Sequence, residues 1–291
     1  MSNDLDRYKK ELDENGLTIL PPEVTGVPES LFDRCIEVLL KKFEAATGCP
    51  ITLEGGPQTQ LEWPKGGTIG FADKSHDPTQ ALLQQLLTLD RCFRDLAVNP
   101  IVDELVDYMM GKTKDGRRAR RLSSANSFIK WQGDFGYGPS LGLHADQASN
   151  PLPWGSTPLA ANATWVLTDY TKQDGALAYV PKSHLENRHP DLPAAAEHAV
   201  AAEAPKGSCI LFSGKTWHGA FPKQTPGLRL CAVTYYRHES ILPQELMRVS
   251  MADQPWEDCE NPDLMRELIG FDDSFPYTQQ GFPLPKAVHA S

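Results

Sequence analysis

Two residues near the middle of the 291-residue chain, His144 and Asp146, have side chains and a spacing that could bind a metal ion. On a β-strand or at its end, residues i and i+2 point to the same side, so the imidazole and the carboxylate would converge. A second histidine beside them would complete a 2-His-1-carboxylate site, which holds ferrous iron on one face and leaves the opposite face open. The pair alone is a weak signal, because a surface histidine beside a solvated aspartate has the same spacing.

His218 is the candidate for the third ligand. It follows an apolar stretch, Cys209 to Phe212, and precedes Gly219, which offers no side chain to hinder an inward-pointing imidazole. The separation from His144 along the chain leaves room for several strands between the two histidines. The alternative is a histidine that only packs in the core or lies on the surface.

Arg229 lies in an otherwise apolar stretch that is typical of a strand. Burying an unpaired charge is costly, so a guanidinium at this position needs an anionic partner. The planar fork of arginine suits a carboxylate that is held by two parallel hydrogen bonds. An arginine on an edge strand that reaches solvent is the alternative.

The elements that must position these residues change in type along the chain. Apolar periodicity and N-terminal signals predict helices over residues 4–14, 28–43, 77–89, 99–110, 243–249 and 262–269. Short apolar stretches bounded by turn residues predict strands over 123–132, 163–167, 176–180, 208–212 and 228–236. Strands of this length and spacing indicate an antiparallel sandwich or barrel. We therefore expect one domain over residues 1–291, with a helical part to about 122, a β core over about 123–240 and a helical tail.

Composition and charge narrow the class of protein. Hydrophobic residues at 40% and charged residues at 23% are typical of a soluble globular protein. A net charge of −10 argues against nucleic acid as the main ligand, because a phosphate backbone attracts basic proteins. No apolar run resembles a signal peptide or reaches membrane-spanning length, so we expect a cytoplasmic protein without a membrane partner.

Two further features concern the basic and the sulfur-containing residues. Six basic residues lie within the ten positions from Lys112 to Arg121. They form either a solvated loop or a clamp for an anionic substrate or partner.

The six cysteines are scattered without a C-x-x-C pair, and several lie in apolar stretches. This usage favours buried free thiols in a reducing compartment.

Four motifs follow one another between residues 123 and 237. They are His144-x-Asp146, the segment from Thr171 to His184, the segment from Lys206 to Ala220 that contains His218, and Arg229. In this order they resemble the phytanoyl-CoA dioxygenase-like branch of the Fe(II)- and 2-oxoglutarate-dependent oxygenases. The resemblance implies a mainly β fold, a double-stranded β-helix (jelly roll) of the cupin type, with flanking helices.

The resemblance also implies roles for individual residues. His144, Asp146 and His218 would hold Fe(II), and Arg229 would bind the distal carboxylate of the co-substrate 2-oxoglutarate. With O₂, such a site oxidises an unactivated C–H bond of a small molecule, often in secondary metabolism. Hydroxylation is the default outcome, and desaturation, cyclisation or epoxidation need the same site.

Three more residues are expected near the co-substrate. The resemblance places Trp165 beside the 2-oxoglutarate pocket. Asn126 and Phe128 share the inward parity of their predicted strand and would line the co-substrate or substrate cavity. For Trp165 and Phe128, plain core packing is the alternative.

The chain also departs from the family pattern. Ala145 replaces a glutamine that family members often carry between the two ligands, and Ala220 replaces a serine that some members use to bind 2-oxoglutarate. Neither change affects the three metal ligands or Arg229. They leave the other contacts to 2-oxoglutarate undefined.

Two other functions fit the same residues. One is a metal-dependent jelly-roll enzyme that does not use 2-oxoglutarate, such as a cupin-like isomerase or oxygenase, and the other is a non-catalytic binding module. The substrate class stays open between a fatty acyl-CoA, an amino acid derivative and a polycyclic natural product. The oligomeric state is equally open, and a homodimer is one candidate.

Overall fold

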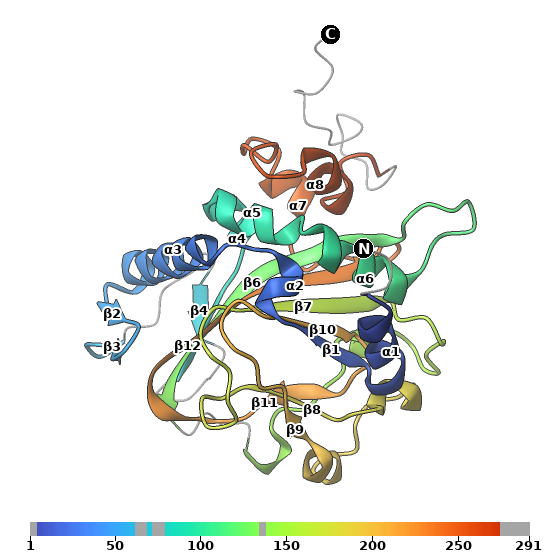
Figure 1. Ribbon diagram of the computed structural model, residues 1–291. Coiled ribbons are helices and arrows are strands. Elements are labelled where there is room, and N and C mark those ends of the chain that lie inside the picture. The colour runs from blue at the N-terminus through green and yellow to red at the C-terminus, as the bar shows by residue number, and fades with distance from the viewer. Residues whose placement is uncertain (1–4, 62–68, 72–78, 134–137, 274–291) are drawn as a thin grey trace.

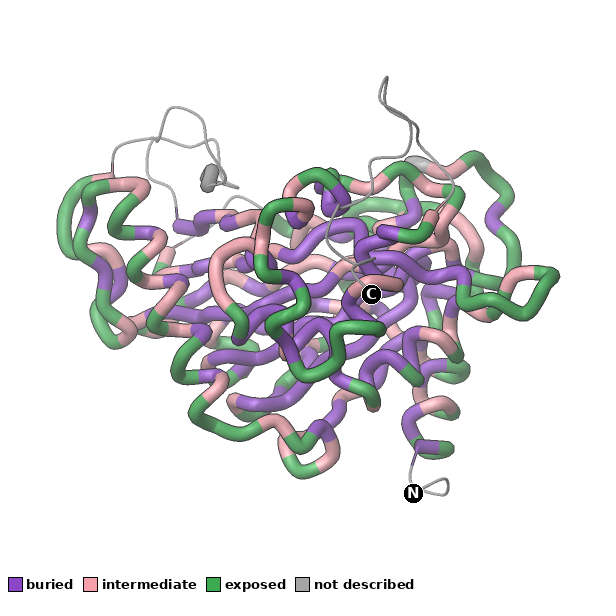
Figure 2. Tube along the Cα trace, turned by 90° about the horizontal axis from the view of Figure 1, so that it is seen from above, coloured by how far each residue is buried: buried purple, intermediate pink, exposed green. Residues whose placement is uncertain are grey.

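A large antiparallel sheet runs through the centre of the protein, with a small sheet on one side and helices on the other (Figure 1). The computed structural model describes residues 5–61, 69–71, 79–133 and 138–273. Seen from above, buried residues follow the central strands and exposed residues gather in the outer loops (Figure 2). None of the helices in these residues combines the length and the apolar character that crossing a membrane requires.

The large sheet has seven strands in the described residues. In spatial order they are β1 (Leu17–Leu20), β10 (Cys209–Ser213), β7 (Ala160–Val166), β12 (Lys223–His238), β6 (Arg120–Gly133), β5 (Gln80–Leu83) and β4 (Ile69–Phe71). Every neighbouring pair is antiparallel. Strands β6 and β12 form the longest pair, and their register sets Asn126 opposite Val233 and Lys130 opposite Arg229.

The small sheet lies below the large one in Figure 1. It consists of β11 (His218–Ala220), β8 (Leu177–Tyr179) and β9 (Val200–Ala201), and a separate hairpin pairs β2 (Ile51–Thr52) with β3 (Gly56–Pro57). An isolated bridge joins His144 to His218, so the segment before Asp146 extends the small sheet. Short 3-10 turns follow at Gly138–Ser140, Asp146–Ser149, Ser183–Glu186 and Ala194–His198.

The helices cover the other face of the large sheet. They are α1 (Asp6–Asn15), α2 (Pro22–Thr25), α3 (Glu29–Thr47), α4 (Leu86–Leu89), α5 (Arg91–Ala97), α6 (Pro100–Met110), α7 (Met247–Ser250) and α8 (Pro262–Leu268). Helix α3 buries Phe32, Cys35, Leu39 and Phe43, a spacing that forms one apolar stripe. Helix α6 begins at a capping Asn99, whose side chain accepts hydrogen bonds from two backbone N–H groups of the first turn.

Two sequence expectations about elements were wrong. Residues 80–83 form strand β5 instead of the middle of a helix, because they pair with β6 from Ser127 to Lys130. Long-range pairing here outweighed the local Asp-Pro helix signal, whose residues 77 and 78 lie outside the described residues. The β core also begins earlier than residue 123, since β1, β4 and β5 join the large sheet. That the chain forms a single domain stays a prediction.

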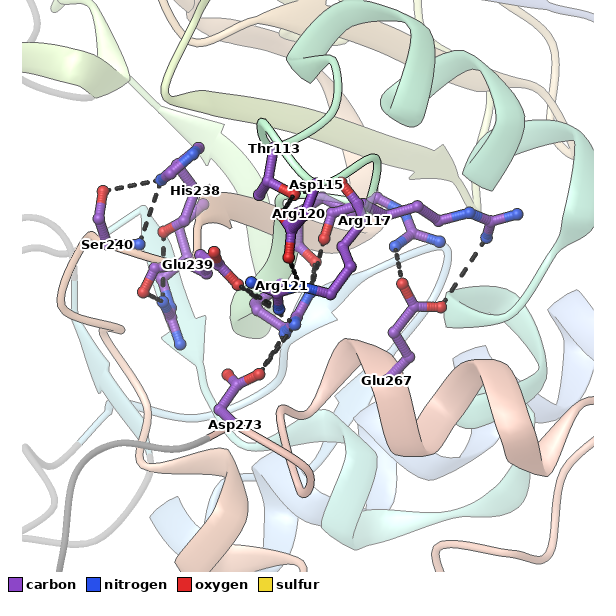
Figure 3. A network of polar contacts seen from close by, with 12 residues as sticks. Thr113, Asp115, Arg117, Arg120, Arg121, His238, Glu239, Ser240, Glu267 and Asp273 are labelled. Carbon is purple, nitrogen blue, oxygen red and sulfur yellow. Dashed lines mark hydrogen bonds and ion pairs between the residues drawn. The ribbon is translucent and has the colours of Figure 1, made fainter.

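The basic cluster between Lys112 and Arg121 is exposed at Lys112, Lys114, Arg117 and Arg118 and buried at Arg120 and Arg121. Its arginines pair with carboxylates of the chain itself (Figure 3). Buried Arg120 lies 2.6 Å from Asp103 and 2.9 Å from Glu267, and Arg121 lies 2.8 Å from Asp273. Because Glu267 belongs to α8 and Asp273 follows it, these ion pairs attach the C-terminal helix to β6.

Candidate active site

The side chains of His144, Asp146 and His218 converge at one point. Their three ligand atoms all lie within 4.8 Å of one another. The Oδ1 atom of Asp146 is 3.5 Å from Nε2 of His144 and 3.6 Å from Nε2 of His218. Among the described residues, this is the one group of three or more such side chains that could hold a metal ion.

Backbone pairing explains how two histidines so far apart in sequence meet. The N–H of each donates to the carbonyl oxygen of the other, both at 2.9 Å, and their ring centroids are 4.3 Å apart. Strand β11 can approach the segment before His144 this closely because position 219 is glycine. A Cβ atom there would collide with the backbone carbonyl of Leu141.

Hydrogen bonds set the tautomer of both imidazoles. Nδ1 of His144 lies 2.9 Å from the carbonyl oxygen of Gly142, and Nδ1 of His218 lies 3.0 Å from that of Thr216. A carbonyl oxygen can only accept, so each Nδ1 carries the proton and each Nε2 presents a lone pair to the common point. Burial lowers the pKa of His218 to about 4, which keeps this imidazole neutral at physiological pH.

Asp146 is held by a neighbour from strand β7. The Nδ2 group of Asn162 donates to Oδ2 of Asp146 at 3.2 Å, which leaves Oδ1 facing the two imidazoles. Burial works against the ionised carboxylate, but His218, His144 and the Asn162 amide together lower the pKa of Asp146 below its ordinary value. The carboxylate is therefore charged and oriented for a cation.

These residues fit a divalent iron ion. A metal bound about 2.1 Å from each ligand atom places neighbouring ligand atoms about 3.0 Å apart. The separations of Asp146 from the two histidines, 3.5 and 3.6 Å, need to close by about half an ångström, and all three ligand atoms already lie within 4.8 Å of one another. Two imidazoles and one carboxylate are also the donor set that non-haem Fe(II) sites use.

The three side chains lie on the wall of a cavity of about 290 Å³ between the two sheets. Strands β5, β6, β7, β10 and β12 line it from the large sheet, and β8 and β11 from the small one. Asn126, Phe128 and Arg229 also line it, as expected from the sequence. The size is at the lower end of small-molecule sites, which suits a compact co-substrate with part of a substrate.

Arg229 lies at the far end of this cavity from Asp146. Its guanidinium is buried and donates to the Tyr170 hydroxyl at 2.8 Å, with the Tyr170 ring 5.0 Å away. Its cross-strand partner is buried Lys130, whose pKa is lowered to about 6 by burial and by the nearby charges of Arg229 and Lys223. An anion bound beside Arg229 would offset this repulsion and favour the protonated form of Lys130.

Trp165 does not line the cavity, so the expected contact with 2-oxoglutarate was wrong. Its side chain is fully buried on the opposite face of β7, and its ring centroid is 6.1 Å from that of Phe32 in α3. Side chains alternate along a strand, and on β7 the even-numbered positions Asn162 and Thr164 face the cavity. Trp165 is core packing beneath a helix.

Sequence reasoning missed Asn162 and Tyr170. Asn162 could have been found from the pattern of β7, where Asn162 and Thr164 alternate with small apolar residues. Tyr170 lies in a loop after β7, and nothing in its local sequence indicates a contact with Arg229. Trp154, in the loop of residues 147–158, belongs with Trp217 to a separate apolar cluster.

Comparison with known proteins agrees with this geometry. A model of the phytanoyl-CoA dioxygenase (PhyH) family matches residues 56–231, more than half of the chain. Dioxygenase af480 of Aspergillus fumigatus is 31% identical over 144 residues, which cover 49% of this chain and 43% of the relative. Dioxygenase FUM3 of Gibberella moniliformis is 29% identical over 147 residues, which cover 48% and 46%. The chain thus spans less than half the length of these relatives.

Solved structures share the fold. The non-heme alpha ketoglutarate dependent epimerase SnoN from nogalamycin biosynthesis matches with a TM-score of 0.58 and 16% identity, over 82% of each chain. HygX from Streptomyces hygroscopicus, solved with nickel and 2-oxoglutarate, matches with a TM-score of 0.53 and 15% identity, over 80% of this chain and 86% of HygX. The expected jelly-roll fold is confirmed, and the chain belongs to the phytanoyl-CoA dioxygenase family.

Proposed function

We propose that this protein is an Fe(II)- and 2-oxoglutarate-dependent oxygenase that oxidises an unactivated C–H bond of a small molecule. One observation carries the proposal. Three ligand atoms of His144, Asp146 and His218 converge on the wall of the same cavity that Arg229 lines. A cupin-like enzyme without 2-oxoglutarate, or a binding module, would have no use for both features together.

The residues of the chain divide the task between the two ends of the cavity. His144, Asp146 and His218 would hold the metal on one side and leave its remaining positions to ligands. Arg229, oriented by Tyr170, would hold the distal carboxylate of the co-substrate and so orient its other end toward the metal. Bound Fe(II) with 2-oxoglutarate and O₂ would supply the oxidising power for C–H cleavage.

The cavity wall between the two ends is mainly apolar. Leu82, Phe128, Leu177, Phe212 and Val233 line it. An apolar wall excludes water, which strengthens the attraction between the guanidinium and a carboxylate. The same wall protects a reactive site from side reactions with solvent.

The substrate belongs, in our proposal, to specialised metabolism, and hydroxylation is the default reaction. SnoN, which shares the fold, has been solved with Fe³⁺, alpha ketoglutarate and nogalamycin RO, and HygX with nickel, 2-oxoglutarate and hygromycin B. Both complexes contain a small natural product. They support a small-molecule substrate for the present chain.

We also propose that the protein acts in the cytoplasm. All six of its cysteines are buried and free. Disulfide bonds persist in oxidising compartments, whereas free thiols are typical of reducing ones. The thiols therefore support a reducing compartment.

The test measures Fe(II) binding, 2-oxoglutarate binding without oxygen, and succinate release after oxygen is added. Wild-type protein should bind both and release succinate slowly even without its substrate. The variants His144→Ala, Asp146→Ala and His218→Ala should lose at least about 100-fold in succinate release, since loss of a mere neighbour of a metal ligand already costs 10- to 100-fold.

Exposed His198, on the turn Ala194–His198, offers a matched control. His198→Ala should retain wild-type succinate release and wild-type stability. Full activity in any of the three ligand variants would remove that residue from the metal site. Failure of folded wild-type protein to bind Fe(II) would favour the non-catalytic binding module.

A further inference from the structure

The metal end is the more open end of the cavity. The side chain of His144 is 55% exposed, whereas Arg229 at the opposite end is 5% exposed. A substrate therefore enters beside the metal, and the side chains around this opening are the first to select it. Gln244 is exposed and lines the cavity. It lies outside residues 56–231, which match the family model, so membership of the family says nothing about its role.

Strand register places Gln244 close to the metal ligands. The Ser124 hydroxyl donates to Oε1 of Gln244 at 2.8 Å. Ser124 pairs across the sheet with Tyr235, whose hydroxyl donates to the backbone carbonyl oxygen of Asp146 at 3.3 Å. Side chains of cross-strand partners are neighbours, so the Gln244 amide lies only two side chains away from a metal ligand.

The part of Gln244 that faces the cavity is its side chain. Its backbone N–H is turned away and donates to the Ser123 hydroxyl at 3.1 Å. The amide reaches Ser124 instead, and Ser124 has the same parity on β6 as Asn126, which lines the cavity. The amide of Gln244 therefore covers the end of the cavity-facing row of β6.

The neighbouring residue holds Gln244 at this place. The buried Glu245 side chain accepts hydrogen bonds from the backbone N–H groups of Gln85 at 2.9 Å and Ala125 at 3.1 Å. Its own backbone N–H donates to the carbonyl oxygen of Ser123 at 2.8 Å. These bonds attach the segment before α7 to the ends of β5 and β6, so a residue from the C-terminal part of the chain is fixed at the opening.

A directed chain of hydrogen bonds decides which end of the Gln244 amide is free. Nδ2 of Asn126 donates to the Ser124 oxygen at 3.2 Å, and the Ser124 hydroxyl gives its one proton to Oε1 of Gln244. The reverse chain would put the NH₂ group of Asn126 where its Oδ1 is now buried without a partner in the described residues. Orphaned buried donors are rarer than orphaned acceptors, so the first direction holds. The Nε2 group of exposed Gln244 is thus left with N–H donors to offer a ligand.

We propose that Gln244 determines substrate specificity, and that the substrate is an uncharged molecule with a carbonyl oxygen that accepts a hydrogen bond from Nε2. A group that only donates is matched by a group that only accepts, as in ketones, esters, lactones and lactams. A carboxylate fits less well, because Arg229 is the one arginine or lysine among the described residues that line the cavity, and it holds the co-substrate. This inference rests on the proposed function, because it assigns Asp146 to the metal.

The test is a double-mutant cycle with small probes, in which the differences between the probes in apolar transfer cancel. Titration calorimetry measures their Kd values with protein that holds Fe(II) and saturating 2-oxoglutarate without oxygen. Acetophenone carries a carbonyl, α-methylstyrene has a CH₂ group in place of the oxygen, and 1-phenylethylammonium carries a charged donor. Gln244→Leu should lower the preference for acetophenone over α-methylstyrene roughly three- to tenfold, the contribution of one neutral hydrogen bond.

Gln244→Glu keeps the size of the side chain and the acceptor for Ser124 but loses the N–H donors. It should weaken acetophenone and bind 1-phenylethylammonium roughly two- to fivefold more tightly than the wild type, the range for exposed ion pairs. Gln173→Leu is the matched control, because Gln173 is exposed and is not among the described residues that line the cavity. It should leave all three Kd values unchanged.

Ser124→Ala tests whether the amide acts in a fixed orientation. Without the hydroxyl, the Gln244 amide can turn and present Oε1 to the cavity as well as Nε2. The preference for acetophenone should then lie between those of the wild type and Gln244→Leu, and 1-phenylethylammonium should bind more tightly than to the wild type. A change in cavity shape alone would affect the three probes alike. The Kd for 2-oxoglutarate should keep its wild-type value in every variant, which confirms that each is folded.

An equal preference for acetophenone in the wild type and in Gln244→Leu would overturn the inference. So would the same loss of preference in Gln173→Leu, or binding of neither neutral probe by protein that holds Fe(II) and 2-oxoglutarate. Failure of the wild type to bind Fe(II) and 2-oxoglutarate would instead overturn the proposed function. The two failures are therefore distinct in one series of titrations.

Discussion

The two faces of the large sheet serve different purposes, and strand β7 shows the contrast most clearly. Asn162 faces the cavity and hydrogen-bonds to Asp146, whereas Trp165 faces the helices and packs against Phe32. Strand β12 repeats the pattern, with Arg229 on the cavity and Leu230 in the layer beneath the helices. One sheet thus carries chemistry on its inner face and stability on its outer face, so substitutions on the two faces should have separable effects.

The largest expected effect comes from the outer face. Trp165→Ala should lower the free energy of unfolding by about 3–5 kcal/mol, the usual cost of a large aromatic side chain removed from a core. Thermal unfolding measures this, and Trp165→Phe should lose much less. Below the unfolding temperature, the affinity for 2-oxoglutarate should stay at the wild-type value. Weaker 2-oxoglutarate binding at unchanged stability would return Trp165 to the co-substrate pocket.

Arg229→Ala, on the inner face, should weaken 2-oxoglutarate binding, in contrast to Trp165→Ala, which should lower stability. Hydrogen bonds to charged groups contribute about 1.5–3 kcal/mol, so the Kd for 2-oxoglutarate should rise roughly 10- to 100-fold. The Kd of Arg229→Lys should lie between those of the wild type and Arg229→Ala, since an ammonium group lacks the planar fork of arginine. Calorimetry with Fe(II)-loaded protein measures both. A normal Kd for 2-oxoglutarate in Arg229→Ala would reject the assigned role.

Asn162→Leu should weaken Fe(II) binding about tenfold, because partners of metal ligands typically contribute 10- to 100-fold. The matched variant is Thr164→Val. The hydroxyl of Thr164 reaches Asp146 only through a 3.3 Å hydrogen bond to Asn162, so its loss should have a smaller effect. Fe(II) titration of the folded proteins decides, and a greater loss in Thr164→Val would contradict the orienting role of Asn162.

The smallest effect is a pH dependence at buried Glu245. Burial raises the pKa of this carboxyl to about 7, against the hydrogen bonds from Gln85 and Ala125 that favour its ionised form. Because the carboxyl binds its proton more tightly in the folded protein, it contributes stability that is fully present at pH values below the pKa of the unfolded chain. This stability is lost as the pH rises through the folded-state pKa of about 7. Relative to Glu245→Gln, the wild type should lose about 1 kcal/mol of stability between pH 6 and 8. Denaturant unfolding at several pH values measures it, and a constant difference would contradict the raised pKa.

Much of the fold and the chemistry could be predicted from local patterns. The expected strands over 123–132, 163–167 and 208–212 overlap β6, β7 and β10, and helices α3 and α6 begin near the predicted residues. The convergence of His144 and Asp146 could also be predicted from their spacing. A spacing of two residues on a strand makes side chains converge by geometry alone, and the distant histidine and arginine complete a recognisable order.

Contacts between segments that are distant in sequence could not be predicted in this way. Local signals favoured a helix where β5 pairs with β6, and no local feature reveals that Arg120 meets Glu267 of α8. The orientation of Trp165 also depends on packing between segments that are distant in sequence. A strand presents alternate residues to opposite sides, but which side becomes the cavity depends on which sheet and which helices pack against it. Spacing along the chain therefore predicts the chemistry, and long-range pairing determines which residues face the cavity.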